Sequence, residues 1–242
     1  DLFPDNVLAE AEATLDGADL TELFGATKYA KPLAANLAGT ARGNFPSFIP
    51  KTDEGRVQNV RDLDEFAGLR FYRSEELDGS SCTVYRKDGQ IGVCSRNLEL
   101  IETEGNAFWA TARSQGIIDA IKDIKTDVAV QGELCGPGIQ GNRYNLDKHE
   151  FFAFNVYDIK AGSYMSKCKF EWFCDLRKIQ TVPVLDEDFC PDDVQLILDD
   201  AEGCSYLNTE VEREGGVWVN DKHGTRLSFK AISNKFLLEG GE

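Results

Sequence analysis

Two Asp-Gly turns ten positions apart, Asp78-Gly79 and Asp88-Gly89, constrain the fold of this chain more than any other feature. Glycine supplies backbone conformations that a β-carbon forbids, so Asp-Gly is typical of a tight turn. After the first turn, Cys82-Thr83-Val84-Tyr85 begins an alternating run. Residues 82 to 96 are therefore predicted to form two strands joined by the loop 86 to 90, because Asp-Gly in a short loop is the strongest hairpin signal.

The stretch from Ser74 to Ser81, which contains the first turn, is acidic and includes Glu75, Glu76 and Asp78. A carboxylate beside a glycine turn at the edge of a strand is positioned for a metal or a nucleotide. Taken alone, these eight residues fit an ordinary hairpin preceded by acidic residues better than they fit a binding site, because short motifs often occur by chance.

The remaining chain favours an α+β class with antiparallel sheets. Apolar spacing, caps and prolines predict helices at residues 5–24 (one or two short helices), 62–66, 106–122, 172–179 and 191–201. Strands are predicted at residues 69–74, 127–133, 151–159, 211–220 and 225–232, and three prolines predict extended chain over residues 28–50. Strands outnumber helices and lie mostly in hairpins, which indicates antiparallel sheets.

The length of the chain, 242 residues, allows a sizeable core in one large domain or two small ones. No apolar run reaches the ~20 residues needed to cross a bilayer, and the start shows no signal-peptide pattern. We expect a cytoplasmic or nuclear protein without a membrane partner.

The formal net charge is −16 at pH 7. Tight nucleic-acid binding depends on Lys and Arg side chains that neutralise phosphates, so this charge argues against a dedicated, high-affinity nucleic-acid surface. A local basic cleft remains compatible with it.

The seven cysteines are odd in number and form no Cys-x-x-Cys pair. We expect reduced, mostly buried thiols. Zinc has little support, because Cys168 and Cys174 have the wrong spacing and the chain contains two histidines.

Further segments follow the acidic turn in a fixed order. They are Ser95-Arg96-Asn97-Leu98-Glu99-Leu100, Gln131 to Gln140, Phe151 to Asn155, Glu214-Gly215-Gly216-Val217 and Ser228-Phe229-Lys230. Together with Glu76-Leu77-Asp78-Gly79, this order resembles the nucleotidyltransferase motifs of ATP-dependent RNA ligases, a group within the superfamily that also includes DNA ligases and mRNA capping enzymes. The upstream segment Gly43 to Glu54 resembles the nicked-RNA ligases of the Deinococcus and Naegleria type. The resemblance extends from about residue 30 to 238.

The resemblance implies an α+β nucleotidyltransferase domain with antiparallel β-sheets flanked by helices, an ATP-grasp-like ligase core. Residues 1–242 would form this single adenylylation domain, and the family's N-terminal domain of the oligonucleotide-binding type would be absent from the chain. The implied cofactors are ATP or AMP with Mg²⁺ or Mn²⁺. The implied substrate is RNA with 3′-OH and 5′-phosphate ends, in a nicked duplex, and the implied state is a monomer.

Glu76 is the anomaly of the first motif, because the family has a lysine there that attacks the ATP α-phosphate. A lysine amine becomes a good nucleophile when its pKa is depressed, whereas a carboxylate cannot form the phosphoramidate. Two explanations compete: an engineered substitution made to trap a substrate complex, or a natural pseudo-ligase. Most other motif residues are in place, which favours the substitution. Lys51 and Lys87 are conceivable substitute nucleophiles, but both lie outside the motif.

By resemblance, Asp78, Glu133 and Glu214 are the carboxylates that hold the metal, directly or through its waters. Adenylyl transfer places negative charge on the α-phosphate, so cations must surround it. Lys230 matches the lysine that contacts this phosphate. Related ligases often have a second lysine two positions later, where this chain has Ile232. Whether Lys235 compensates stays open.

The resemblance also implies nucleotide contacts for Glu75, Arg56, Arg96, Phe154 and Gly79. Glu75 would read the adenine amino group, and Phe154 would stack on adenine. Phe152 is an alternative stacking residue because strand periodicity places it on the same face, and both could be plain core residues. Arg56 would bind the β- and γ-phosphates or form a surface ion pair. Arg96 would contact ribose or the 3′-OH strand, or form a salt bridge at a strand end.

Two other functions remain open. An mRNA capping guanylyltransferase shares the motif order but uses GTP, and the segment Gly43 to Glu54 argues for the ligase instead. A nucleotide-binding pseudo-ligase would bind nucleotide without transferring it.

Overall fold

The computed structural model describes residues 23–24, 39–61, 63–66, 68–221 and 226–240. The chain divides into one unit of residues 1–34 and a second of residues 35–242, and every helix and strand given below belongs to the second. The helices predicted within residues 5–24 lie outside the described residues, apart from residues 23 and 24. The predicted single domain over residues 1–242 therefore stays a prediction. Within the described residues, no helix is both long and apolar enough to span a membrane.

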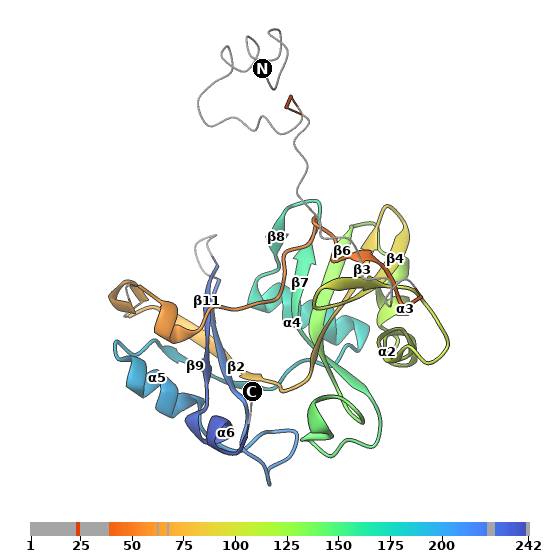
Figure 1. The fold of residues 1–242 in the computed structure, drawn as a ribbon. Coiled ribbons are helices and arrows are strands. Elements are labelled where there is room, and N and C mark those ends of the chain that lie inside the picture. The colour runs from red at the N-terminus through yellow and green to blue at the C-terminus, as the bar shows by residue number, and fades with distance from the viewer. Residues whose placement is uncertain (1–22, 25–38, 62, 67, 222–225, 241–242) are drawn as a thin grey trace, which may run out of the picture. The chain divides into compact units, whose positions relative to one another are not determined.

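The second unit contains two antiparallel sheets (Figure 1). The seven-stranded sheet has the order β1 (Ala41–Asn44), β5 (Leu98–Leu100), β4 (Gln90–Ser95), β3 (Ser80–Lys87), β6 (Val128–Cys135), β7 (Glu150–Asp158), β8 (Ser163–Tyr164). The four-stranded sheet has the order β11 (Leu227–Ile232), β10 (Gly215–Asn220), β2 (Arg70–Glu76), β9 (Val184–Phe189). The α+β class with antiparallel sheets is confirmed.

The helices of the described residues are short. They are α2 (Ala107–Ser114), α3 (Ile117–Lys122), α4 (Lys167–Arg177), α5 (Val194–Ala201) and α6 (Asn234–Leu238), with 3₁₀ turns η2 (Val57–Asn59), η3 (Leu63–Phe66) and η4 (Gln140–Asn142). The side chain of Asn106 accepts from Phe108 N and Trp109 N, so the predicted N-cap is confirmed. The single helix predicted over residues 106–122 is split, because Gly116 takes a left-handed φ of 72° and begins α3 anew.

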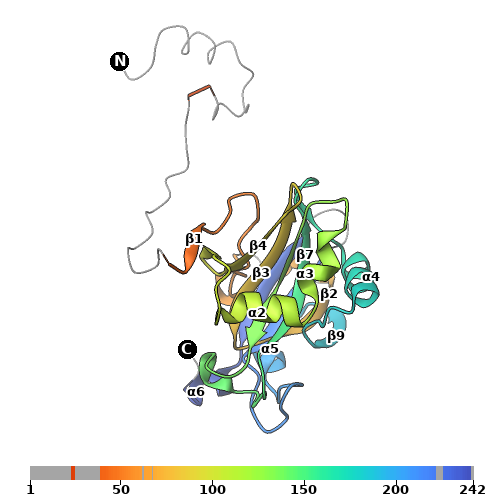
Figure 2. The same ribbon diagram turned by 90° about the vertical axis from the view of Figure 1, so that its right-hand side faces the viewer.

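Each sheet has its own hydrophobic core. In the seven-stranded sheet, Val84, Val130 and Phe151 pack with residues of α2, α3 and α4 (Figure 2). In the four-stranded sheet, Phe71, Trp218 and Phe229 pack with Ile197 of α5 and Val57 of η2. Because side chains alternate along a strand, every second side chain lies on the other face of its sheet. Residues on that face line the cavity described below.

The predicted hairpin of residues 82–96 is confirmed: β3 pairs with β4 in a register that places Tyr85 opposite Gly92 and Lys87 opposite Gln90. Asp88 and Gly89 both take left-handed φ values, 51° and 79°, which the two-residue turn requires. The first Asp-Gly turn behaves differently. It joins β2 to β3, and these strands belong to different sheets, so it is a crossing and not a hairpin.

The prediction of free, mostly buried thiols is confirmed. All seven cysteines are free; five are buried, and Cys168 and Cys204 are exposed.

Candidate active site

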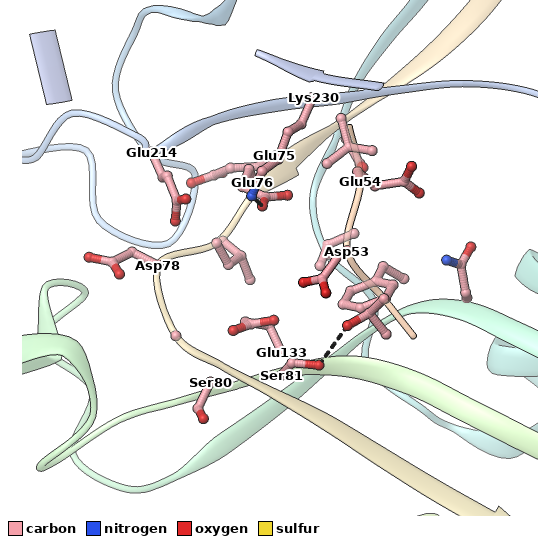
Figure 3. Close-up of a pocket in the computed structure, with 18 of the residues that line it drawn as sticks. Asp53, Glu54, Glu75, Glu76, Asp78, Ser80, Ser81, Glu133, Glu214 and Lys230 are labelled. Atoms are coloured by element: carbon pink, nitrogen blue, oxygen red, sulfur yellow. Dashed lines mark hydrogen bonds and ion pairs between the residues drawn. The ribbon is translucent and has the colours of Figure 1, made fainter. Parts of the chain in front are cut away.

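A cavity of about 870 Å³ is lined by residues of both sheets and by residues 52–56. Its lining includes Glu76, Asp78, Glu133, Glu214 and Lys230, which are the residues predicted to act in catalysis. Figure 3 shows the side chains of Glu76, Glu133, Glu214 and Lys230 around one space, with Asp78 at its edge. The structure thus brings together residues as far apart in sequence as 76 and 230.

The crossing between the sheets is held in place by neighbours that the sequence did not reveal. Asp78 N donates to Tyr144 Oη over 2.6 Å. A β-carbon on Gly79 would lie 2.7 Å from Leu134 O and close to the side chain of Glu133, so a larger residue would push the turn off β6. Tyr144 is buried. Its position within the irregular segment between β6 and β7 explains why no periodic pattern indicated it.

The carboxylates crowd one another at the site. Burial raises the pKa of Glu133 well above its usual range, and the charges of Glu76 and Glu214 raise it further. Burial raises the pKa of Glu214 to about 8, and the charge of Glu76 adds to this. Cations are therefore needed here to stabilise the ionised forms.

Lys230 supplies one such cation, and its Nζ donates to Glu76 Oε1 over 2.7 Å. Burial lowers the pKa of Lys230, but the carboxylate of Glu76 outweighs burial, so that the pKa is raised. The predicted nucleophile position and the predicted α-phosphate lysine thus form an ion pair. No nucleotide is needed to explain the charge state of Lys230 in this arrangement.

The carboxylate oxygens suit Mg²⁺ or Mn²⁺, which prefer oxygen ligands. Among the residues that the structure describes, however, no three Asp, Glu, His or Cys side chains converge as a preformed metal site. Metal binding by Asp78, Glu133 and Glu214, directly or through its waters, stays a prediction.

Phe154 lines the cavity, whereas Phe152 is buried with Leu77 and Tyr144. Strand β7 pairs Ala153 with Gly132 and Asn155 with Gln131, which leaves Phe154 as the extra residue of a β-bulge. The bulge comes after Ala153, so Phe152 and Phe154 stay on one face and pack in the same cluster, as strand periodicity predicted. Phe154 is the ring that is accessible for stacking.

Glu75 lies differently from its neighbour Glu76. Glu75 of β2 pairs with Gly216 of β10. Its side chain therefore lies on the same face of the sheet as Trp218, which is the face that carries the core of this sheet. Although part of Glu75 lines the cavity, its carboxylate is buried and its Oε2 accepts from Tyr206 N over 2.9 Å. Burial raises the pKa of Glu75. Reading of the adenine amino group stays a prediction; the contact shown here supports the loop at Tyr206.

The predicted arginines both line the cavity. Arg56 forms a parallel bridge with Lys230 through the backbone, and its side chain is exposed. Arg96 Nη2 lies 2.6 Å from Asp53 Oδ1, which is the salt bridge considered as its alternative role. Contact with ribose or with an RNA end stays a prediction.

The candidate substitute lysines have other partners. Lys51 donates to Asn97 Oδ1, and Lys87 donates to Asp88 Oδ2. Neither lines the cavity, so neither replaces the motif lysine. Lys235 pairs with Glu202 over 2.9 Å and Ile232 is buried, so a second phosphate-binding lysine is not found at these positions.

We expect the metal-free protein to lose stability as the pH rises from 4.5 to about 8, because of the carboxyl groups at this site. The folded-state pKa of Glu214 is raised from 4.5 to about 8, so the folded state binds this proton more tightly than the unfolded state does. The stabilising contribution is complete below the unfolded pKa and is lost between the two values. Chemical denaturation in EDTA across this pH range measures the effect. Glu76→Gln should flatten the dependence, and an unchanged slope in that variant would contradict the coupling.

The family model described as RNA ligase matches residues 70–232. No curated protein sequence matches the chain. Among solved structures, a lysine-to-alanine mutant of Naegleria gruberi RNA ligase with ATP and Mn is 39% identical, with 98% of this chain and 71% of that chain covered and a TM-score of 0.79. The Naegleria gruberi RNA ligase with PPi shows the same identity and TM-score, with 98% and 72% covered.

An arginine-to-alanine mutant of the same Naegleria gruberi ligase, with ATP and Mn, gives 39% identity, 98% and 72% coverage and a TM-score of 0.80. The family match covers more than half of the chain, and the structural matches span nearly all of it. This chain belongs to the RNA ligase family.

Proposed function

We propose that this chain is the adenylyl-transfer domain of an ATP-dependent RNA ligase, whose reaction joins 3′-OH and 5′-phosphate RNA ends through enzyme-AMP and RNA-adenylate intermediates. The observation that carries the proposal is the cavity in which Lys230, Glu133 and Glu214 surround the end of β2. We further infer a monomer that acts on nicked duplexes. The ligase structures similar to this chain contain ATP or AMP with Mn, which supports these cofactors here.

The metal would be held by Asp78, Glu133 and Glu214. When bound, it supplies positive charge that stabilises the transition state of phosphoryl chemistry. The burial that raises the pKa of Glu133 and Glu214 also lowers the local dielectric, so charge neutralisation by a cation is worth more here than in water.

The nucleotide would be held by groups on both sheets. Lys230 would bind the α-phosphate, and Arg56, its backbone neighbour, would bind the outer phosphates. Phe154 would stack on adenine from the bulge in β7, opposite the sheet that carries Val217. Gly79 allows the crossing to lie close against β6.

Glu76 occupies the nucleophile position without an amine, and its carboxylate binds the ammonium that would otherwise face the α-phosphate. We infer that this chain does not adenylylate itself and that Glu76 is an engineered substitution in an otherwise largely intact ligase site. The support is the retention of Lys230, Asp78, Glu133 and Glu214 around one cavity, which a decayed site has no reason to keep.

The test measures nucleotide binding to the unaltered chain. Calorimetry in the presence of Mn²⁺ gives the affinities for ATP and for GTP. We expect ATP to bind without a covalent protein-AMP adduct in the intact mass, and GTP to bind more weakly. Lys230→Ala should weaken ATP binding, whereas Glu102→Ala, in an exposed ion pair with Arg113, serves as the control. Tighter binding of GTP would favour a capping guanylyltransferase, and absence of ATP binding would refute the proposal.

A further inference from the structure

Residues 50–56, here named the cleft segment, pass from one sheet to the other along the cavity. At its start the segment is attached to the seven-stranded sheet: Gln131 Nε2 donates to Pro50 O over 2.8 Å, and the hydroxyls of Thr52 and Ser81 are 2.8 Å apart. At its end it is attached to β11 of the four-stranded sheet. The segment therefore depends on both sheets for its position.

Glu54 makes the attachment to β11. Its Oε1 accepts from Arg226 Nη2 over 2.8 Å, and its Oε2 accepts from Ser228 Oγ over 2.6 Å. The next residue continues the contact, because Lys230 N donates to Gly55 O over 2.8 Å. Both carboxylate oxygens of Glu54 and the following carbonyl are thus bound to β11 and to Arg226, the residue before it.

The ion pair between Glu54 and Arg226 is sheltered. Their side chains are only 21% and 18% exposed, and the Arg226 guanidinium also lies 4.9 Å from the centroid of the Tyr164 ring. Exposed ion pairs contribute little, whereas a hydrogen bond to a charged group that is shielded from water contributes more. Removal of the Glu54 carboxylate would leave the partly buried Arg226 guanidinium without this carboxylate partner.

Arg56 lies two residues after Glu54, so its position depends on this attachment. The backbone of Arg56 bridges to Lys230, yet its exposed side chain makes no hydrogen bond or ion pair with the part of the chain that the structure describes. Its charge acts on Glu214 and Lys230, but no hydrogen bond or ion pair with another described residue fixes the side chain beside Lys230. The anchor of the cleft segment at Glu54 and Gly55 does so instead.

We propose that Glu54 is a positioning residue: by binding Arg226 and Ser228 it holds Arg56 beside Lys230, so that the two cations meet one polyphosphate chain and the site distinguishes ATP from AMP. This inference rests on the proposed function, because it assumes that Lys230 and Arg56 face a bound nucleotide. Cations fixed in advance bind polyphosphate more tightly than mobile ones, since less conformational freedom is lost on binding.

The test is a double-mutant cycle on the chain as it stands, with the affinities for ATP and AMP measured by calorimetry in Mn²⁺. Glu54→Ala should weaken ATP binding by about tenfold, the size expected for loss of a charged hydrogen bond. AMP, which lacks the outer phosphates, should bind with little change. In an Arg56→Ala background, Glu54→Ala should have no further effect on ATP, because the residue it positions is gone.

Glu54→Gln is the conservative variant, since its amide keeps an acceptor for Arg226 and should retain most of the preference for ATP. Thermal unfolding of each variant separates lost folding from lost positioning, because a general loss of stability would weaken ATP and AMP alike. Equal weakening of both ligands, or additive effects in the cycle, would overturn the positioning role. Failure of the parent chain to bind ATP would instead refute the proposed function.

Discussion

The Glu76→Lys variant is expected to become covalently adenylylated when it is incubated with ATP and Mn²⁺ or Mg²⁺, whereas the parent chain remains unmodified. Position 76 ends β2 inside the cavity, beside Lys230 and among three carboxylates. The cation Lys230 would favour the neutral, nucleophilic form of a lysine introduced there, whereas the three carboxylates would favour its charged form until a metal neutralises them. It would also release Lys230 from its present ion pair with Glu76. The change therefore restores the nucleophile and frees the phosphate-binding lysine together.

Intact mass spectrometry, with α-labelled ATP as a second readout, measures the adduct. Glu76→Gln is the matched control: it removes the charge that holds Lys230 but supplies no amine, so it should bind ATP and remain unlabelled. A nicked RNA duplex with a 5′-phosphate should then remove AMP from the adduct of Glu76→Lys. A Glu76→Lys protein that binds ATP and stays unlabelled would identify a pseudo-ligase that has lost more than its nucleophile.

The sequence was sufficient for those parts of the fold that depend on local chemistry. The β3–β4 hairpin follows from the Asp-Gly turn, and its register confirms it. The motif residues Asp78, Glu133, Glu214 and Lys230, which the family resemblance singled out, all line one cavity, and their roles stay predictions. Local turn signals and ordered motifs are carried by neighbouring residues, so a single sequence contains them.

Other features could not be predicted because they depend on tertiary partners. The sequence predicts a turn at Asp78-Gly79, but only the pairing of β2 with β10 and of β3 with β6 shows that the turn crosses between sheets. Likewise, the bulge at Phe154 exists because β6 and β7 slip in register, and Phe152 is inaccessible because Leu77 and Tyr144, which are distant in sequence, pack on it. Strand β9 was missed, since its residues Val184–Phe189 are acidic and mostly exposed and show no alternation.

The contacts of Tyr144 and Glu54 were missed for the same reason. Tyr144 binds the backbone of a residue 66 positions away, and Glu54 binds side chains 172 and 174 positions away. Neither belongs to a periodic pattern, and both act on residues other than themselves. Positioning residues of this kind carry no local signal that differs from an ordinary polar residue.

Glu133→Ala and Glu214→Ala, each in the Glu76→Lys background, are expected to slow self-adenylylation by about a hundredfold or more, because metal-supported charge stabilisation commonly supplies several kcal/mol of barrier lowering. Their folds should persist. Both carboxyl groups are buried, and burial is the main cause that raises the pKa of each, so their removal eliminates a desolvation cost in the metal-free protein. Single-turnover labelling at saturating ATP and metal measures the rate.

Glu99→Gln is the matched control for these two variants. Glu99 is also a sheltered carboxylate in the seven-stranded sheet, where it accepts from Tyr85 Oη and from Arg42, but it does not line the cavity. Its replacement should lower thermal stability and leave the labelling rate unchanged, whereas Glu133→Ala and Glu214→Ala should lower the rate and leave stability in EDTA unchanged or higher. The opposite pattern, with near-normal labelling and reduced stability in both alanine variants, would assign these glutamates to the structure of the sheets. Because burial alone raises the pKa of any enclosed carboxyl group, only this separation of rate from stability distinguishes a group that serves the metal from one that is merely enclosed.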